Sequence, residues 1–350
     1  MAATNNPLEG ASTASTAVSS QTFTIAGILV TVHGLAELPS NLSSVACLWL
    51  LNPRLQTKET MAPIAAQLIS SWNAQKPKAV GLIAAAFDQR NHGSRLVDKL
   101  HNEAWRQGNP RHAQDMFGCY HGTSVDCSHL ISYLESYIFH DTAPSPPRIT
   151  NHFALGISLG GHATWHCLLS DPRITAGVVG IGCPDYTRLM TDRARLSKLT
   201  TYTDSSPPGA DFLGSTDFPP ALQTAVAQFD PAGLLLPGCF NPTGSDPAPS
   251  KAALDRFKTI ARERLGGKQI LNLSGRDDKL VPYAAGEPFL DVFKQILQED
   301  TSLNIGFEDV LFDGVGHAFP KAMADKATEW LCDILAKEEA SGEGRRGSKI

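Results

Sequence analysis

The stretch "ALGISLGGHATWHCLL" (residues 154–169) holds one serine between small residues and continues into an apolar segment. The apolar residues before Ser158 predict a strand and those after it a helix, so the serine lies at a strand-to-helix turn. Gly156 and Gly160 flank it as G-x-S-x-G, where larger side chains would clash. Such a turn projects the hydroxyl above the sheet and places the Leu159 amide at a helix N-terminus, where it stabilises an oxyanion. The alternative is a glycine-rich phosphate-binding junction, although "GISLGG" is not G-x-G-x-x-G.

Short apolar segments alternate with helical patterns along the chain. The strands are expected at 23–36 (one or two), 45–52, 79–88, 149–158, 176–184, 268–275 and 305–314. Helices are expected at 58–75, 124–138, 187–199, 220–236, 250–265 and 320–339. Near-continuous apolar strands separated by helices predict an α/β fold, with a mostly parallel sheet covered on both faces.

The alternation of predicted strands and helices divides the chain into regions. Residues 1–21, rich in Ser, Thr, Ala and Asn, are expected to be a disordered tail. Residues 22–183 and 267–338 carry the predicted core. The insertion 184–266 has two Pro/Gly/Ser-rich loops and helical pieces, and we expect it to be a cap, because insertions of this kind commonly cover active sites. Residues 339–350 are expected to be a flexible C-terminal tail.

Composition narrows the possible partners. The net charge is −5, whereas a nucleic-acid groove requires a basic excess. No apolar run reaches the roughly 20 residues of a membrane span, and the N-terminus lacks the features of a secretory signal. The seven cysteines contain no C-x-x-C pair, so we expect reduced, mostly structural thiols and no zinc site. No cofactor or metal is expected, and the chain is compatible with a monomer or a homodimer.

The compartment follows from the same features. Reduced thiols and the absence of a secretory signal favour the cytoplasm. The terminal Ser348-Lys349-Ile350 differs from the peroxisomal signal S-K-L only in its last residue. Peroxisomal import is therefore the alternative.

A serine hydroxyl needs a base to act as a nucleophile, and the base needs an orienting carboxylate. The segment "NLSGRDDKLVPY" follows the predicted strand 268–275 and supplies Asp277 and Asp278. "FDGVGHAFP" supplies His317 between the last predicted strand and the last predicted helix. Serine, acid and histidine come in this chain order on sheets of this kind, and the joint placement is more specific than any one motif.

These segments resemble those of a known family. "GISLGG", "SGRDDKLVP" and "GVGHAF" resemble the three catalytic segments of the α/β-hydrolase superfamily, and "FDQRNHGSR" (87–95) is similar to its D-x-R-x-H-G-x-S segment. The resemblance covers about residues 25 to 338. It implies Ser158 as nucleophile, His317 as base and Asp278 as acid, since Asp278 matches the pattern G-x-x-D-x-x-V-P. Asp277 is the alternative acid.

The resemblance also implies a second oxyanion donor, in the loop after the strand that ends "LWLLN". Many members of the family have His-Gly there, whereas this chain has Asn52-Pro53, and proline has no N–H to donate. The expected donor is the amide of Arg54 or Leu55. The Arg54 side chain either binds an anionic group of the substrate or pairs with Glu59.

The resulting hypothesis is a serine hydrolase, carboxylesterase-like or thioesterase-like, that cleaves a carboxylic ester, thioester or lactone of a small molecule. Its apolar acyl pocket is expected under the cap, lined by Phe212, Phe218, Leu234, Leu235 and Phe240. One alternative is an acyltransferase or a cyclase/lyase of a biosynthetic pathway that uses the same triad. Another is a non-catalytic binding protein, because a fold alone does not imply activity.

The remaining histidines of these segments are interpreted as structural. His92 is expected in a turn. His162 and His166, four residues apart on the helix after Ser158, are expected to be packing or surface residues, because a third metal ligand is missing.

Overall fold

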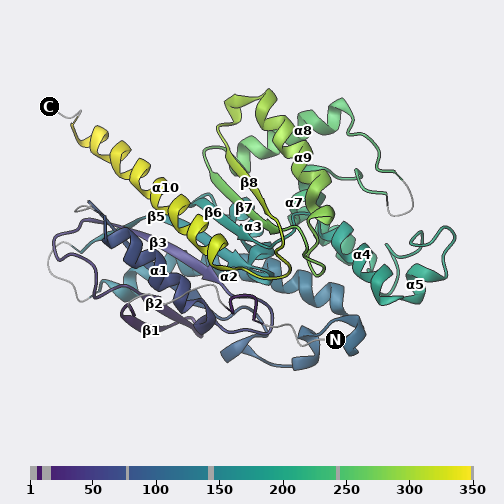
Figure 1. Ribbon diagram of the computed structural model, residues 1–350, viewed down its shortest axis with the longest axis horizontal. Coiled ribbons are helices and arrows are strands. Elements are labelled where there is room, and N and C mark those ends of the chain that lie inside the picture. The colour runs from purple at the N-terminus through teal and green to yellow at the C-terminus, as the bar shows by residue number, and fades with distance from the viewer. Residues whose placement is uncertain (1–5, 10–16, 76–78, 141–145, 242–244, 348–350) are drawn as a thin grey trace.

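A computed structural model describes residues 6–9, 17–75, 79–140, 146–241 and 245–347. At its centre is an eight-stranded sheet with the strand order β1-β2-β4-β3-β5-β6-β7-β8 (Figure 1). β1 pairs with β2 and β2 with β4 in antiparallel fashion, and every other neighbouring pair is parallel. The predicted fold class, a mostly parallel sheet with helices on both faces, is confirmed.

The strands are β1 (Ser20–Ile25), β2 (Ile28–His33), β3 (Ser44–Leu51), β4 (Val80–Phe87), β5 (Arg148–Ile157), β6 (Ile174–Gly180), β7 (Gln269–Gly275) and β8 (Gly306–Phe312). All of β3 and nearly all of β4 are buried. Their unbroken apolar sequences suit a strand covered on both faces. Because β3 and β5 to β8 are parallel, the loops after them meet at one edge of the sheet.

The α-helices are α1 (Ala62–Asn73), α2 (His112–Ile138), α3 (Leu159–Ser170), α4 (Tyr186–Ser197), α5 (Thr200–Thr203), α6 (Pro220–Phe229), α7 (Pro231–Leu235), α8 (Lys251–Leu265), α9 (Tyr283–Glu299) and α10 (Lys321–Gly347). α1 and α10 lie side by side on one face of the sheet (Figure 1), and α2, α3, α8 and α9 pack on the other. In the described part of the chain, no helix is both long enough and apolar enough for a membrane span.

The segment predicted as a cap lies between β6 and β7. Its described residues form α4 to α8 and contain no strand. Side chains of α4 and α6 join a separate hydrophobic cluster with Trp105, Leu159 and the first turns of α2. This cluster ties the segment to the edge of the sheet where the loops after the parallel strands meet.

Both predicted tails contain ordered structure. Leu8 is buried, and the Phe319 amide donates to the Pro7 carbonyl at 2.7 Å. β1 already begins at Ser20. The prediction of disorder over 1–21 is therefore wrong for these residues, because one apolar side chain finds a place beside α10. At the other end, α10 continues to Gly347 instead of ending near 338. Ser348-Lys349-Ile350 lies outside the described residues.

Two helices differ from the sequence prediction. α2 begins at His112, twelve residues before the predicted start at 124, because Met116, Phe117 and Tyr120 bury a face interrupted in sequence by polar residues. α9 was not predicted, since Gly286 and Pro288 break its helical pattern. It forms because Phe289, Leu290, Phe293 and Ile296 pack into the core.

Three buried histidines make stability depend on pH. Burial lowers the pKa of His152 to about 4 and those of His162 and His166 to about 3. Below about pH 6.5 these histidines take up protons in the unfolded chain but stay neutral in the folded chain. Their contribution to the free energy of unfolding is therefore complete above that pH and is lost as the pH falls. Each group contributes up to about 1.4 kcal/mol per pH unit.

We therefore expect His166→Leu to flatten the pH dependence of the unfolding free energy between about pH 6.5 and pH 4. Urea denaturation at several pH values measures this difference against wild type. His129→Gln, at an exposed position of α2, is the control and should leave the slope unchanged. Parallel curves for His166→Leu and wild type would contradict the prediction.

Candidate active site

Ser158 forms the turn between β5 and α3. Its backbone has φ 56° and ψ −112°, a conformation that costs a non-glycine residue about 1–3 kcal/mol. A Cβ on Gly156 would lie 1.9 Å from the Gly160 carbonyl oxygen, and a Cβ on Gly160 would lie 2.0 Å from the Leu51 carbonyl oxygen. Both glycines are therefore required for the close approach of this turn to β3 and to its own helix.

Gly160→Ala is expected to destabilise the protein by more than about 3 kcal/mol, because the new methyl group overlaps backbone that cannot move away. Urea denaturation of soluble protein, or loss of soluble expression, measures the effect. Gly118→Ala is the matched control. Gly118 is an exposed helical glycine with nothing within 4 Å of the added Cβ, so this variant should gain up to about 1 kcal/mol. Similar stabilities for the two variants would contradict the prediction.

Ser158, His317 and Asp278 come together although they follow three different strands. The Ser158 hydroxyl lies 2.9 Å from His317 Nε2, and His317 Nδ1 lies 2.8 Å from Asp278 Oδ2. With the proton on Nδ1, the imidazole donates to Asp278 and accepts from Ser158. The geometry has the order nucleophile, base and acid that acyl transfer requires.

The structure distinguishes the two candidate aspartates. Asp278 is buried, and its second oxygen accepts the amides of Leu280 at 2.8 Å and Val281 at 2.9 Å. These two bonds fix the carboxylate toward His317. Asp277 is exposed on the same loop. Of the two, Asp278 is therefore the residue that contacts the histidine.

A cavity of about 570 Å³ opens beside Ser158 and His317. Of the three predicted oxyanion donors, Leu159 and Arg54 line it and Leu55 does not. The loop that carries Arg54 is held by Asn52, whose side-chain amide donates to the carbonyls of Pro53 and Gln56 at 3.0 and 2.9 Å. Leu159 is the first residue of α3, where amides have no acceptor within the helix.

The apolar residues predicted to line the acyl pocket lie elsewhere. Phe212 and Phe218 are fully buried against Trp105 and Tyr186, and Leu235 belongs to the core. Phe240 stacks with the Arg188 guanidinium at 4.4 Å beside a different cavity. The apolar side chains of the cavity beside Ser158 include Trp105, Met116, Leu196 and Leu280. Sequence reasoning missed these because the segments that carry them are far apart in the chain.

The segment "FDQRNHGSR" (87–95) begins the loop between β4 and α2, and polar contacts hold it in place. Asp88 accepts from the Lys58 amide at 2.8 Å and from the Ser94 amide and hydroxyl at 2.9 and 2.7 Å. Arg90 and Arg95 pair with Asp126 of α2. The His92 ring is buried, with Nδ1 2.9 Å from the Arg90 carbonyl oxygen. This segment therefore holds the loop in place and does not line the cavity.

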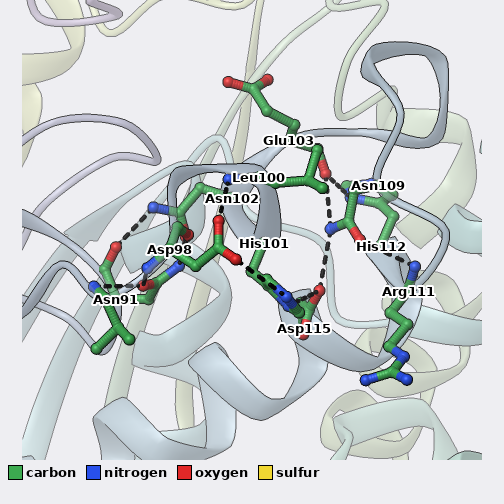
Figure 2. Close-up of polar contacts among 11 residues, drawn as sticks. Asn91, Asp98, Leu100, His101, Asn102, Glu103, Asn109, Arg111, His112 and Asp115 are labelled. Atoms are coloured by element: carbon green, nitrogen blue, oxygen red, sulfur yellow. Dashed lines mark hydrogen bonds and ion pairs between the residues drawn. The ribbon is translucent and has the colours of Figure 1, made fainter.

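Further polar contacts fix the next part of the loop, residues 98–112. Figure 2 shows the Asn91 and Asn102 side chains joined to each other and His101 between Asp98 and Asp115. The Glu103 carbonyl accepts from the Asn109 side chain at 3.1 Å, and it lies 2.9 Å from His112 Nδ1. The positions of Trp105 and His112 at the cavity wall depend on this network.

His162 and His166 pack inside the protein. His162 stacks on Tyr120 with the ring centres 4.5 Å apart, and its Nδ1 lies 3.0 Å from the Cys183 carbonyl oxygen. The His166 ring meets Phe117 edge-on. His162 also touches the cavity wall, which the sequence prediction of a packing residue did not anticipate.

No family model and no curated protein matches the chain. Among solved structures, it is similar to TT1662 from Thermus thermophilus, with a TM-score of 0.53 and 17% identity over 91% of this chain and 98% of that one. A cold-adapted esterase from an Arctic intertidal metagenomic library has a TM-score of 0.46 and 13% identity, covering 90% of this chain and 92% of the esterase.

The acylaminoacyl peptidase of Pyrococcus horikoshii has a TM-score of 0.48 and 12% identity. The match covers 92% of this chain but 41% of the peptidase, so this chain spans about two fifths of that protein. At such identities a likeness concerns the fold. The strand order and the turn after β5 fit an α/β-hydrolase fold, and the likeness to TT1662 concerns the fold alone.

Proposed function

We propose that this protein is a serine hydrolase that cleaves a carboxylic ester, thioester or lactone through an acyl-enzyme. The observation that carries the proposal is the unbroken series of contacts from Ser158 Oγ to His317 Nε2 and from His317 Nδ1 to Asp278, at the wall of a cavity large enough for a small molecule.

In the first half of the reaction, Ser158 Oγ attacks the acyl carbon while His317 Nε2 accepts its proton. Asp278 holds the imidazole in the required tautomer and stabilises the imidazolium. The carbonyl oxygen becomes an oxyanion, which the Leu159 amide at the start of α3 and the Arg54 amide would stabilise. His317 then donates its proton to the leaving alcohol or thiol as the bond to the acyl carbon breaks.

In the second half, water attacks the acyl-enzyme. His317 accepts a proton from the water, and the ester bond to Ser158 breaks as His317 returns that proton to the serine oxygen. The products are the carboxylic acid and the free enzyme. An alcohol or thiol in place of water would convert the same steps into acyl transfer.

Residues 184–266 act as a cap in this proposal. Arg193, Leu196 and Ser197 of α4 line the same cavity as Ser158 and His317. A segment in this position selects the substrate and limits the access of water to the acyl-enzyme.

The test combines covalent labelling with substrate profiling. A fluorophosphonate should label wild type at Ser158, as located by mass spectrometry, and 4-nitrophenyl esters of graded chain length should be hydrolysed with an optimum that reflects the cavity. A 4-nitroanilide of the best acyl group tests whether amides are cleaved too. Labelling without hydrolysis, followed by product formation when an alcohol or thiol is added, would replace the hydrolase by an acyltransferase. Absence of labelling would contradict the proposal.

A further inference from the structure

The cavity beside Ser158 is lined by four cationic side chains. Arg54 comes from the loop after β3, Arg106 from the loop before α2, Arg193 from α4 and Lys279 from the loop after β7. No carboxylate-bearing side chain is among the described residues that line it. The whole chain has a net charge of −5, so this concentration of positive charge is a property of the cavity and not of the composition.

Two of these cations are half-buried, and their hydrogen bonds to the described residues go to neutral groups. Arg54 Nη1 donates to the Asn102 carbonyl at 2.6 Å. Arg193 Nη2 donates to the Leu280 carbonyl at 3.1 Å. Neither guanidinium forms an ion pair with a carboxylate of the described residues, and Glu59, the partner considered for Arg54, pairs with Lys58 instead.

Several arginines elsewhere in the described chain are paired with a carboxylate. An aspartate pairs with each of Arg90, Arg95, Arg173, Arg188 and Arg195. A guanidinium presents its N–H groups in a planar fork that suits a carboxylate or phosphate. Arg54 and Arg193 therefore retain donors for an anion that is not part of the protein.

His112 orients Arg193 without adding charge. Its Nδ1 faces the Glu103 carbonyl at 2.9 Å, so this nitrogen carries the proton and Nε2 is left as an acceptor 3.4 Å from Arg193 Nη1. Burial, and then the charges of Arg193 and Arg54, lower the pKa of His112 well below its ordinary value. The neutral ring is held by the network of Figure 2.

The two arginines also act on each other. Burial and then the Arg193 charge lower the pKa of Arg54, whereas the charge of Glu103 opposes this shift. Two like charges beside a partly apolar cavity are unfavourable unless an anion lies near them. A bound carboxylate would relieve this repulsion and accept hydrogen bonds from both forks.

We propose that this cavity binds an ester that carries an anionic group, in the simplest case a second carboxylate, held by Arg54 and Arg193 while Ser158 attacks the ester carbonyl. The inference rests on the proposed hydrolase function and names its substrate class. The carboxylate belongs either to the acyl part or to the leaving group, and the experiment distinguishes these two.

The experiment compares charged esters with neutral analogues of the same shape. Mono-4-nitrophenyl adipate and its terminal amide test a carboxylate on the acyl part, and 4-carboxyphenyl acetate and 4-carbamoylphenyl acetate test one on the leaving group. Wild type should prefer the charged member of one pair by about tenfold or more in kcat/KM, since one charge-assisted hydrogen bond suffices for that factor. Added salt should reduce the preference.

Arg193→Gln should lower this preference by about tenfold, and Arg193→Lys should restore part of it, because the charge returns without the fork. Arg195→Gln is the matched control, since Arg195 is exposed on the same helix, pairs with Asp192 and does not line the cavity. It should leave activity and preference unchanged.

The outcomes separate the two proposals. Hydrolysis of neutral and charged esters at equal rates would overturn the anionic substrate and leave the hydrolase standing. If wild type is neither labelled nor active, the hydrolase proposal fails, and calorimetric titration with free adipate then decides the anion site. Adipate binding that is lost in Arg193→Gln would support the site, and no binding to wild type would overturn it.

Discussion

Ser158→Ala is expected to lower kcat toward a 4-nitrophenyl ester by about a million-fold and to abolish fluorophosphonate labelling. The variant removes the only oxygen within hydrogen-bond distance of His317 Nε2 among the described residues. The cavity and the oxyanion amides remain, so a residual rate about 10³-fold above that in water is expected. Stopped assays at high enzyme concentration measure this residual rate.

The control for this prediction is Ser136→Ala, an exposed serine of α2, which should leave kcat and labelling unchanged. His317→Ala should lose about as much activity as Ser158→Ala, and the double variant no more, because the two side chains act as one unit. If Ser158→Ala retained more than about a hundredth of the wild-type rate, another nucleophile would be responsible.

Asp278→Asn is expected to lower kcat by about ten-thousand-fold while the fold is preserved. An amide at this position can donate to His317 Nδ1, which would place the imidazole proton on Nε2 and remove the base that faces Ser158. Kinetics at saturating ester, with circular dichroism to confirm folding, measure the effect.

Asp277→Asn is the matched control because it makes the same chemical change one residue away, at an exposed position. It should retain wild-type activity. If the two variants had equal activities, Asp278 would not be the orienting acid, and the assignment based on the G-x-x-D-x-x-V-P pattern would have to be withdrawn.

The sequence alone predicts those features of the fold that depend on residues close together in the chain. Gly156, Ser158 and Gly160 predict a tight turn because small residues are the only ones that fit there, and the structure has that turn. The near-continuous apolar sequences of the strands predict a parallel sheet, because such strands have both faces covered. The positions of Asp278 and His317 after two later strands follow, because the carboxyl ends of parallel strands meet at one edge.

The residues that form the cavity wall could not be predicted from the sequence in this way. Arg193 and His112 lie on amphipathic helices with no local motif, and they meet only because α4 crosses near the start of α2. Long-range packing also explains why α9 forms in spite of Pro288 and why Leu8 is buried. It explains as well why Phe212 and Phe218 lie in a separate hydrophobic cluster and do not line the cavity.

The division has a physical cause. Backbone sterics, periodic burial and strand direction depend on near neighbours in the chain. The sheet, the turn at Ser158 and the order of the three candidate catalytic residues can therefore be predicted from the sequence. The charge and shape of the cavity depend on which distant surfaces pack together. The side chains that would choose a substrate, Arg54 and Arg193 above all, acquire their common environment only when the folded chain brings their loops to the same edge of the sheet.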